Sequence, residues 1–371
     1  MTAIESVLDE GLRAARYPGA VCRVRCRGSV QTVAVGAVAT HDAHGTPIAT
    51  VDREPARPEI LYDLASLTKV FTAITMLTLV DEGCLSPDEP IADHLESFSG
   101  DADREQVTLL HLLTHTSGLP PVWQGWRGKP SSAHGWSREA VIAEILALPL
   151  TQRPGRRLDY SCVGYITAMA LAEAITGQGW DELVSARVLR PLGLEATCFN
   201  PLDHSVTPAG IAPTEYQPGL GRGVVRGTVH DETAWLLGGV SGNAGLFSNL
   251  DDLGRLAESI HAGLPGVLSP ASFRLLWDDQ LPRLLGRAAD AEASRNGYRH
   301  AAGLCVGQTR AAGPRQPQMR SHTGFTGTSM VINEAGDYAI LLSNRVHPTR
   351  EAPDLAPTRV ALTAAAGLLE S

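Results

Sequence analysis

A hydrophobic segment from Val70 to Val80 is apolar on almost every side. Such a segment predicts a helix buried inside the protein, because a surface helix would keep one polar face. Gly83 follows the segment and is the expected end of the helix. Ser66 and Lys69 lie three residues apart at its predicted start, so their side chains are expected to share one face.

The remaining hydrophobic pattern predicts helices near both ends and throughout the middle of the chain, and strands close to the two termini. Helical spacing occurs over residues 5–16, 109–113, 138–147, 162–176, 180–189, 251–260 and 356–370. β-prone runs occur over 21–27, 30–35, 302–309, 328–333 and 338–344, with turn residues at 28–29 and 334–337. Strands at both ends with helices between them predict an α/β (α+β) protein, in which an antiparallel sheet is flanked by helices. We expect residues 1–65 and 296–371 to form the sheet region and 66–295 a mostly helical region, with the active site between them.

Composition narrows the class of protein. The chain has 371 residues, and 43% hydrophobic and 19% charged residues predict a globular protein with a sizeable core. A net charge of −9 without a basic run disfavours nucleic acid and anionic membranes as partners. No apolar stretch approaches the ~18 residues of a membrane span, and the N-terminal residues do not resemble a signal peptide. A cytoplasmic protein with free thiols at its six cysteines is therefore expected.

Two sequence features are ambiguous. His111 and His115 have the spacing of a zinc pair on a helix, but Leu112 replaces the expected glutamate and no third ligand is apparent. We therefore expect neither a metal nor another cofactor. The loop over 121–137 carries Trp123, Trp126 and Trp136, which either line a substrate pocket or pack the loop onto its own body.

Ser66 and Lys69 form a candidate nucleophile and base. Burial and a helix N-terminus both disfavour a charged lysine, so the amine of Lys69 is expected to accept the serine proton. Of the 31 lysines and arginines only Lys69 and Lys129 are lysines, and arginine cannot serve as such a base. The alternative is a lysine that extends to solvent beside a helix-capping serine.

Two further passages accompany this Ser-x-x-Lys motif. Tyr160-Ser161-Cys162 precedes a predicted helix, and His322-Thr323-Gly324 enters a strand. In order and spacing the three motifs resemble those of the serine β-lactamase and penicillin-binding-protein superfamily. Residues 112–120, 238–248 and 322–329 are similar to passages of its class C-like hydrolases, whereas 229–232 and 344–348 look most like the branch with peptidoglycan-recycling amidases.

The resemblance implies the serine β-lactamase fold and a set of roles. Ser66 would be the acylated nucleophile, Lys69 its general base, and Tyr160 the group that moves a proton between leaving group and acceptor. The backbone N–H groups of Ser66 and Phe325 would form the oxyanion hole. The strand edge that docks the substrate would be lined by His322, Thr323 and Gly324, and Lys69 with His322 would supply the positive charge that Tyr160 needs as a base.

Two residues depart from the family pattern. Cys162 stands where relatives carry Asn or Asp, and a thiol is a weak hydrogen-bonding group, so poor penicillin hydrolysis is expected. Asn243 stands where relatives of this branch often carry His, which indicates a changed acceptor or leaving-group site. The alternative for Cys162 is a thiol that only fills space.

These features predict a serine acyl-transfer enzyme. Its acyl-enzyme on Ser66 would pass the acyl group of a small-molecule ester or amide to water or to an amine or alcohol. Esterase, amidase and transacylase activities stay open, in muropeptide or in natural-product metabolism. The alternative is a catalytically silent ligand-binding module of the same fold. The sequence does not predict the oligomeric state.

Overall fold

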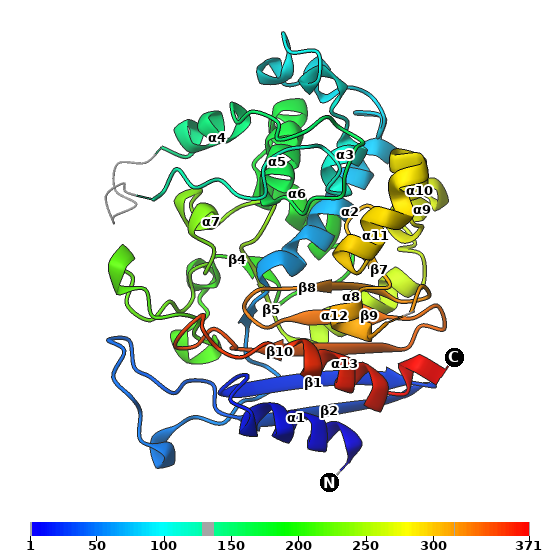
Figure 1. The fold of residues 1–371 in the computed structure, drawn as a ribbon. Helices are drawn as coiled ribbons and strands as arrows, with labels where there is room; N and C mark the ends of the chain where they lie inside the picture. Colours follow the sequence, from blue (N-terminus) through cyan, green and yellow to red (C-terminus); the bar gives the residue numbers. More distant parts are fainter. Residues whose placement is uncertain (1, 128–136, 315, 371) are drawn as a thin grey trace.

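A seven-stranded antiparallel sheet forms the lower half of the molecule as drawn in Figure 1. The computed structural model describes residues 2–127, 137–314 and 316–370. The strand order is β2-β1-β10-β9-β8-β7-β6, so strands from the two ends of the chain are neighbours. The strands are β1 (Gly19–Cys26), β2 (Ser29–Gly36), β6 (Arg299–His300), β7 (Cys305–Val306), β8 (Arg320–Thr323), β9 (Ser329–Ile332) and β10 (Tyr338–Ser343). The predicted antiparallel sheet from both termini is confirmed.

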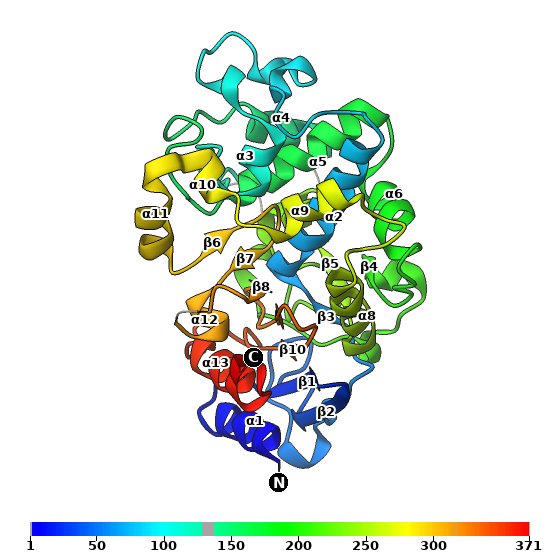
Figure 2. The same ribbon diagram turned by 90° about the vertical axis from the view of Figure 1, so that its right-hand side faces the viewer.

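Helices cover both faces of this sheet (Figure 2). Alternate residues of β10 explain why: Ala339 and Leu341 pack on one face, whereas Ile340 and Leu342 pack on the other. The first face is covered by α1 (Ala3–Arg13) and α13 (Ala356–Ala365), with α12 (Thr309–Ala312) beside them. The second is covered by α8 (Leu250–His261) and the helical region.

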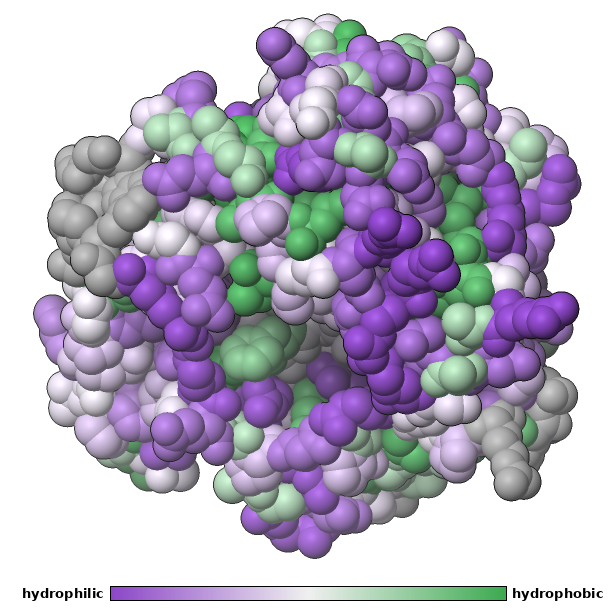
Figure 3. Space-filling model, turned by 45° about the horizontal axis from the view of Figure 1, so that its top comes forward, coloured by the Kyte–Doolittle hydropathy of each residue, from purple (hydrophilic) through white to green (hydrophobic). Residues whose placement is uncertain are grey.

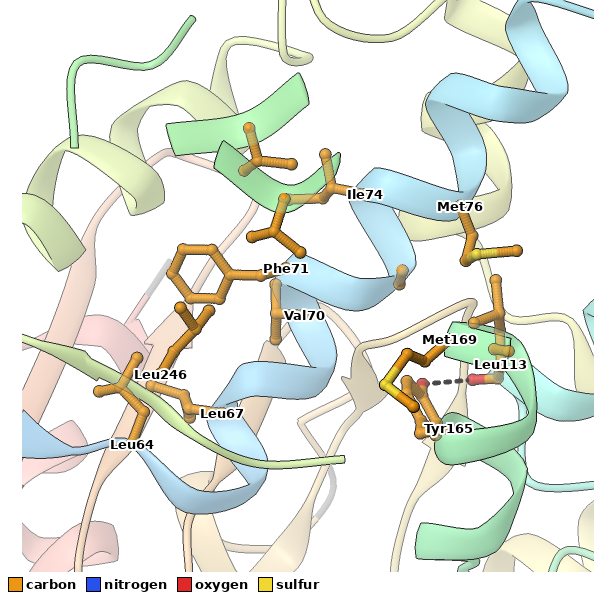
Figure 4. Close-up of a cluster of buried hydrophobic side chains, with 14 of the residues drawn as sticks. Leu64, Leu67, Val70, Phe71, Ile74, Met76, Leu113, Tyr165, Met169 and Leu246 are labelled. Carbon is orange, nitrogen blue, oxygen red and sulfur yellow. Dashed lines mark hydrogen bonds between the residues drawn. The ribbon is translucent and has the colours of Figure 1, made fainter. Parts of the chain in front are cut away.

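The helical region is built around α2 (Thr68–Asp81), in which every residue from Thr68 to Leu79 is buried. Figure 4 shows side chains of α2 among those of neighbouring segments, including Tyr165, whose hydroxyl donates to the carbonyl of Leu113 at 2.7 Å. The predicted core helix is therefore confirmed. The other helices are α3 (Leu109–Leu113), α4 (Arg138–Leu146), α5 (Cys162–Thr176), α6 (Trp180–Val184), α7 (Glu232–Leu236), α9 (Pro270–Trp277), α10 (Leu281–Leu285) and α11 (Ala289–Asn296).

A second, three-stranded sheet lies where the two regions meet, in the order β3-β5-β4. It consists of β3 (Tyr62–Asp63), β4 (Cys198–Phe199) and β5 (Leu246–Ser248). β3 ends three residues before Ser66, so this sheet fixes where the candidate nucleophile enters α2.

Some predicted boundaries are wrong. The strand expected over 302–309 is reduced to Cys305–Val306, because Gly303 and Gly307 have positive φ values of 95° and 63° and bend the backbone on both sides. Helix α9 was not predicted, although Ser269 followed by Pro270 is a helix-start signal. Among the described residues, no helix is long and apolar enough to cross a membrane.

Candidate active site

Ser66 lies in a short 3₁₀ turn, Ala65–Leu67, immediately before α2, rather than in the first turn of the α-helix itself. The turn begins with Ala65 in a left-handed conformation at φ 46°, which is unfavourable for a residue with a side chain. The N–H of Ala65 donates to Asp63 Oδ1 at 2.8 Å and stabilises this conformation. The chain thus turns sharply at the candidate nucleophile.

Lys69 is fully buried and its amine contacts Ser66 directly. The Nζ atom lies 2.9 Å from Ser66 Oγ, 2.9 Å from the carbonyl oxygen of Asn243 and 3.5 Å from Cys162 Sγ. The predicted pair therefore meets at hydrogen-bonding distance. Asn243 contributes its backbone to this contact, because its side chain is buried and accepts a hydrogen bond from Ser241 at 2.7 Å.

Tyr160 lies beside this pair, just before α5. Its ring centre is 5.0 Å from Lys69 Nζ. Burial, followed by the neighbouring Cys162, raises the pKa of Tyr160 well above its usual value of 10.0, against the opposing effect of the Ser66 hydroxyl. Tyr160 is thus a neutral phenol at pH 7, able to donate a proton to a leaving group.

His322 does not supply the positive charge expected beside Tyr160. Its side chain is buried, and burial together with the charge of Lys69 lowers the pKa of His322 well below its usual 6.5. Its Nδ1 lies 3.1 Å from the carbonyl of Thr323, which leaves Nε2 without a partner in the described part of the chain. The prediction of a cationic His322 is wrong, because burial of the ring and the nearby charge of Lys69 both disfavour the protonated imidazole.

The segment after β8 contacts the residues that precede Ser66. The hydroxyl of Thr326 donates to the carbonyl of Asp63 at 2.7 Å, and that of Thr328 to the carbonyl of Leu64 at 2.9 Å. Gly324 permits this approach, since a Cβ atom there would lie 2.4 Å from the oxygen of Leu64. Phe325, whose N–H is the second candidate oxyanion donor, is thereby held close to the nucleophile turn.

A cavity of about 400 Å³ adjoins these residues. One side contains Arg359, which is 9% exposed and donates to the carbonyls of Gly324 and Thr328, while its Nε has no partner among the described residues. Burial, then repulsion by Arg345 and Arg310, lowers the pKa of Arg359 to about 10. The full lining is Tyr160, Tyr298, Cys305, Gln308, Arg310, His322, Thr323, Gly324, Phe325, Arg345, Asp354, Leu355 and Arg359. Three arginines against one aspartate make the cavity positively charged.

Figure 3 shows that the face it presents is hollowed near its middle, with hydrophobic residues inside and a mostly hydrophilic rim. A larger cavity, of about 960 Å³, lies around Leu189, Cys198 and Phe199 and contains none of the predicted site residues.

The tryptophan loop contributes packing. The ring of Trp123 is buried in the core and fills the space over Gly125, where an added Cβ would lie 2.3 Å from it. The prediction that Trp123 lines a pocket is therefore wrong, and the packing alternative describes it. Trp126 packs partly buried against the same core and does not line the 400 Å³ cavity. Trp136 lies outside the described residues.

His115 is a site neighbour that the sequence did not reveal. Its ring lies against that of Tyr160, with centres 4.2 Å apart and 33° between the planes, and its Nδ1 accepts the N–H of Ser161 at 3.0 Å. His111 instead accepts the N–H of Thr108 at the start of α3. His111 and His115, which have the spacing of a zinc pair, therefore bind different parts of the backbone.

Comparisons with known proteins agree with the geometry. A family model described as "Beta-lactamase" matches residues 4–364. A protein of Escherichia coli O157:H7 described as "Putative D-alanyl-D-alanine carboxypeptidase" is 32% identical over 309 residues, which cover 77% of this chain and 69% of that protein.

Two solved structures show the same fold. EstCE1, described as "a hydrolase with promiscuous acyltransferase activity", is 20% identical with a TM-score of 0.73, covering 98% of this chain and 97% of that chain. A mutant of the simvastatin synthase LovD from Aspergillus terreus is 21% identical with a TM-score of 0.73, covering 99% and 95%. At these sequence identities the two structures show that the fold is shared and nothing beyond the fold.

Proposed function

This chain belongs to the β-lactamase family of serine hydrolases, and on that premise we propose that it forms an acyl-enzyme on Ser66 and passes the acyl group to water or to an amine or alcohol. The observation that carries the proposal is the buried amine of Lys69 at 2.9 Å from Ser66 Oγ. The ring centre of Tyr160 lies 5.0 Å from the same amine. A silent binding module would not need all three groups in one place.

The proposed reaction begins when Ser66 Oγ attacks the substrate carbonyl and its proton moves to Lys69. The charge that develops on the carbonyl oxygen would be stabilised by the N–H groups of Ser66 and Phe325. Tyr160 would donate its proton to the leaving group and recover one from Lys69, because its phenol is protonated at pH 7. The same steps in reverse would let water or another acceptor attack the acyl-enzyme.

The positive cavity supports a substrate class. It extends from Tyr160, the proposed proton donor to the leaving group, to Arg310, Arg345 and Arg359. Arginine binds carboxylates with charge-assisted hydrogen bonds, so we propose an ester or amide whose leaving portion carries a carboxylate. A carboxypeptidase, as the curated relative is described, acts on a substrate of this kind. An amino acid as the acceptor would fit the same cavity.

Intact-mass spectrometry tests the proposed acyl-enzyme. We expect one adduct with a fluorophosphonate and a transient adduct with p-nitrophenyl acyl esters, both mapped to Ser66 and both lost in Ser66→Ala. Product analysis with and without D-alanine as an added acceptor then separates hydrolysis from acyl transfer. No adduct with fluorophosphonates, esters or a D-alanyl-D-alanine peptide would contradict the proposal and favour the binding module.

A further inference from the structure

Asp63 is a buried carboxylate that joins three segments around the nucleophile. It is 2% exposed, at the end of β3. Its Oδ1 accepts the N–H of Ala65 at 2.8 Å, and its Oδ2 accepts the N–H of His230 at 2.6 Å. Its carbonyl oxygen accepts the hydroxyl of Thr326 at 2.7 Å. The proposed mechanism gives Asp63 no role.

Each of the three segments that Asp63 contacts lies next to Ser66 or Phe325, the two residues of the proposed oxyanion hole. Ala65 is the left-handed residue directly before Ser66, and Thr326 directly follows Phe325. The ring of His230 stacks on that of Phe325, with centres 5.6 Å apart and 26° between the planes. His230 is in turn fixed by Glu215, whose Oε2 lies 2.9 Å from its Nε2. The two candidate oxyanion donors are therefore connected through Asp63 from both sides.

We infer that Asp63 is a positioning residue that sets the spacing between the N–H groups of Ser66 and Phe325. This inference rests on the proposed acyl-enzyme mechanism. Stabilisation of a tetrahedral oxyanion requires both donors within hydrogen-bonding distance of one oxygen, so a small displacement of either segment would weaken it. Asp63 touches no reacting atom and acts through the two segments that it connects.

The carboxylate suits this task better than an amide of the same shape. Ala65 and His230 donate to different oxygens of Asp63, and both oxygens of a carboxylate are acceptors. In Asp63→Asn one of those oxygens becomes an NH₂ donor that opposes an N–H group, so one segment is released. Burial raises the pKa of the Asp63 carboxyl, whereas the N–H groups of His230 and Ala65 act to lower it.

Asp252 offers a control for the loss of a buried carboxylate charge. It also accepts two backbone N–H groups, those of Ala196 and Thr197 at 2.9 and 2.8 Å, but both donate to its Oδ2, and it borders β4 rather than the nucleophile turn. Asp252→Asn therefore removes a buried negative charge without touching the oxyanion segments. If loss of such a charge alone lowered the oxoester-to-thionoester ratio, the ratio would fall in both variants.

The test compares a p-nitrophenyl oxoester with its thionoester, in which sulfur replaces the carbonyl oxygen and accepts hydrogen bonds poorly. In Asp63→Asn we expect the oxoester kcat to fall about 10²-fold with little change in KM, which is the size of losing one oxyanion donor. The thionoester should lose less, so the oxoester-to-thionoester ratio of kcat falls. Asp252→Asn should keep the wild-type ratio.

Two outcomes would overturn the inference: an unchanged ratio in Asp63→Asn, or an equal fall in Asp252→Asn. If Asp63→Asn does not fold, Thr326→Val removes only the hydroxyl contact, and its ratio should fall relative to Thr75→Val, a buried hydroxyl that bonds the carbonyl of Phe71. An unchanged ratio there would also overturn the inference. A wild-type protein that forms no acyl-enzyme would refute the proposed function instead.

Discussion

Cys162 Sγ lies 3.5 Å from the amine of Lys69, in contact with the proposed base. Cys162 is the first residue of α5, whose N-terminus Ser161 caps by accepting the N–H of Gly164. The position that the family fills with an amide or carboxylate is therefore at the site in this chain as well. What differs is the hydrogen-bonding capacity of the side chain, since a thiol is both a weak donor and a weak acceptor.

The first prediction concerns the substrates that this thiol permits. Wild-type protein should turn over penicillins and cephalosporins poorly, and Cys162→Asn should raise that activity, because an amide offers strong hydrogen bonds to both Lys69 and a substrate carbonyl. The same change should lower activity on the native substrate if the thiol makes room for a larger acyl group. Paired rates on nitrocefin and a simple ester, with Cys162→Ala as control, provide the measurement. An unchanged ratio of the nitrocefin rate to the ester rate would mean that Cys162 only fills space.

The second prediction is that Ser66, Lys69 and Tyr160 act as one unit. Ser66→Ala, Lys69→Ala and Tyr160→Phe should each lower kcat by ~10³-fold or more, and the triple variant should be little worse than the singles. Kinetics on one ester, with circular dichroism to confirm folding, test this. Near-normal activity of Lys69→Ala would remove the lysine from the mechanism.

The third prediction addresses the charge of the cavity. Arg345 lines it, lies over the ring of Phe325 at 5.5 Å and donates to the carbonyls of Phe325 and Ala352 at 3.4 and 3.0 Å. Arg345→Gln should lower kcat/KM for a substrate with a free carboxylate on its leaving group by about 10- to 100-fold, the value of a charge-assisted hydrogen bond. The methyl ester of that carboxylate should be affected much less. Arg153→Gln, at an exposed arginine outside the cavity, is the control, and equal losses on both substrates would contradict the prediction.

The hydrophobic pattern predicts the strands and the core helix α2, because both follow from local periodicity. The three-residue spacing of Ser66 and Lys69 predicts their contact. The left-handed turn at Ala65 was not foreseen, since it depends on a hydrogen bond that its N–H donates to a side chain of the second sheet. The contact between the rings of His115 and Tyr160 joins residues far apart in the chain. The neutral state of His322 depends on the packing around it, which no spacing reveals. The division at residues 65 and 295 and the cytoplasmic location stay predictions.

The fourth prediction concerns stability at acidic pH, and His347 is the clearest case. Its Nδ1 lies 2.9 Å from the carbonyl of Thr214, while its Nε2 accepts the N–H groups of Thr40 and His41 at 3.0 and 3.3 Å. An imidazole that donates at one nitrogen and accepts at the other must be neutral. Burial lowers the pKa of His347 to about 4, and it also lowers the pKa of His300 to about 4.

The sign of the effect follows from proton uptake. In the unfolded chain these histidines bind protons below pH ~6.5, whereas the folded protein binds them only near pH 4. Between these values acidification favours the unfolded state, so the free energy of unfolding should fall by up to about 1.4 kcal/mol per pH unit for each histidine. Urea titrations between pH 7 and 5.5 measure this slope before most carboxylates titrate. His347→Gln should reduce the slope by up to one proton, because glutamine can accept the same N–H groups without gaining charge, while the exposed His204→Gln serves as the matched control. An unchanged slope in His347→Gln would mean that the imidazole takes up its proton as readily in the folded protein as in the unfolded chain, which its two accepted N–H groups contradict.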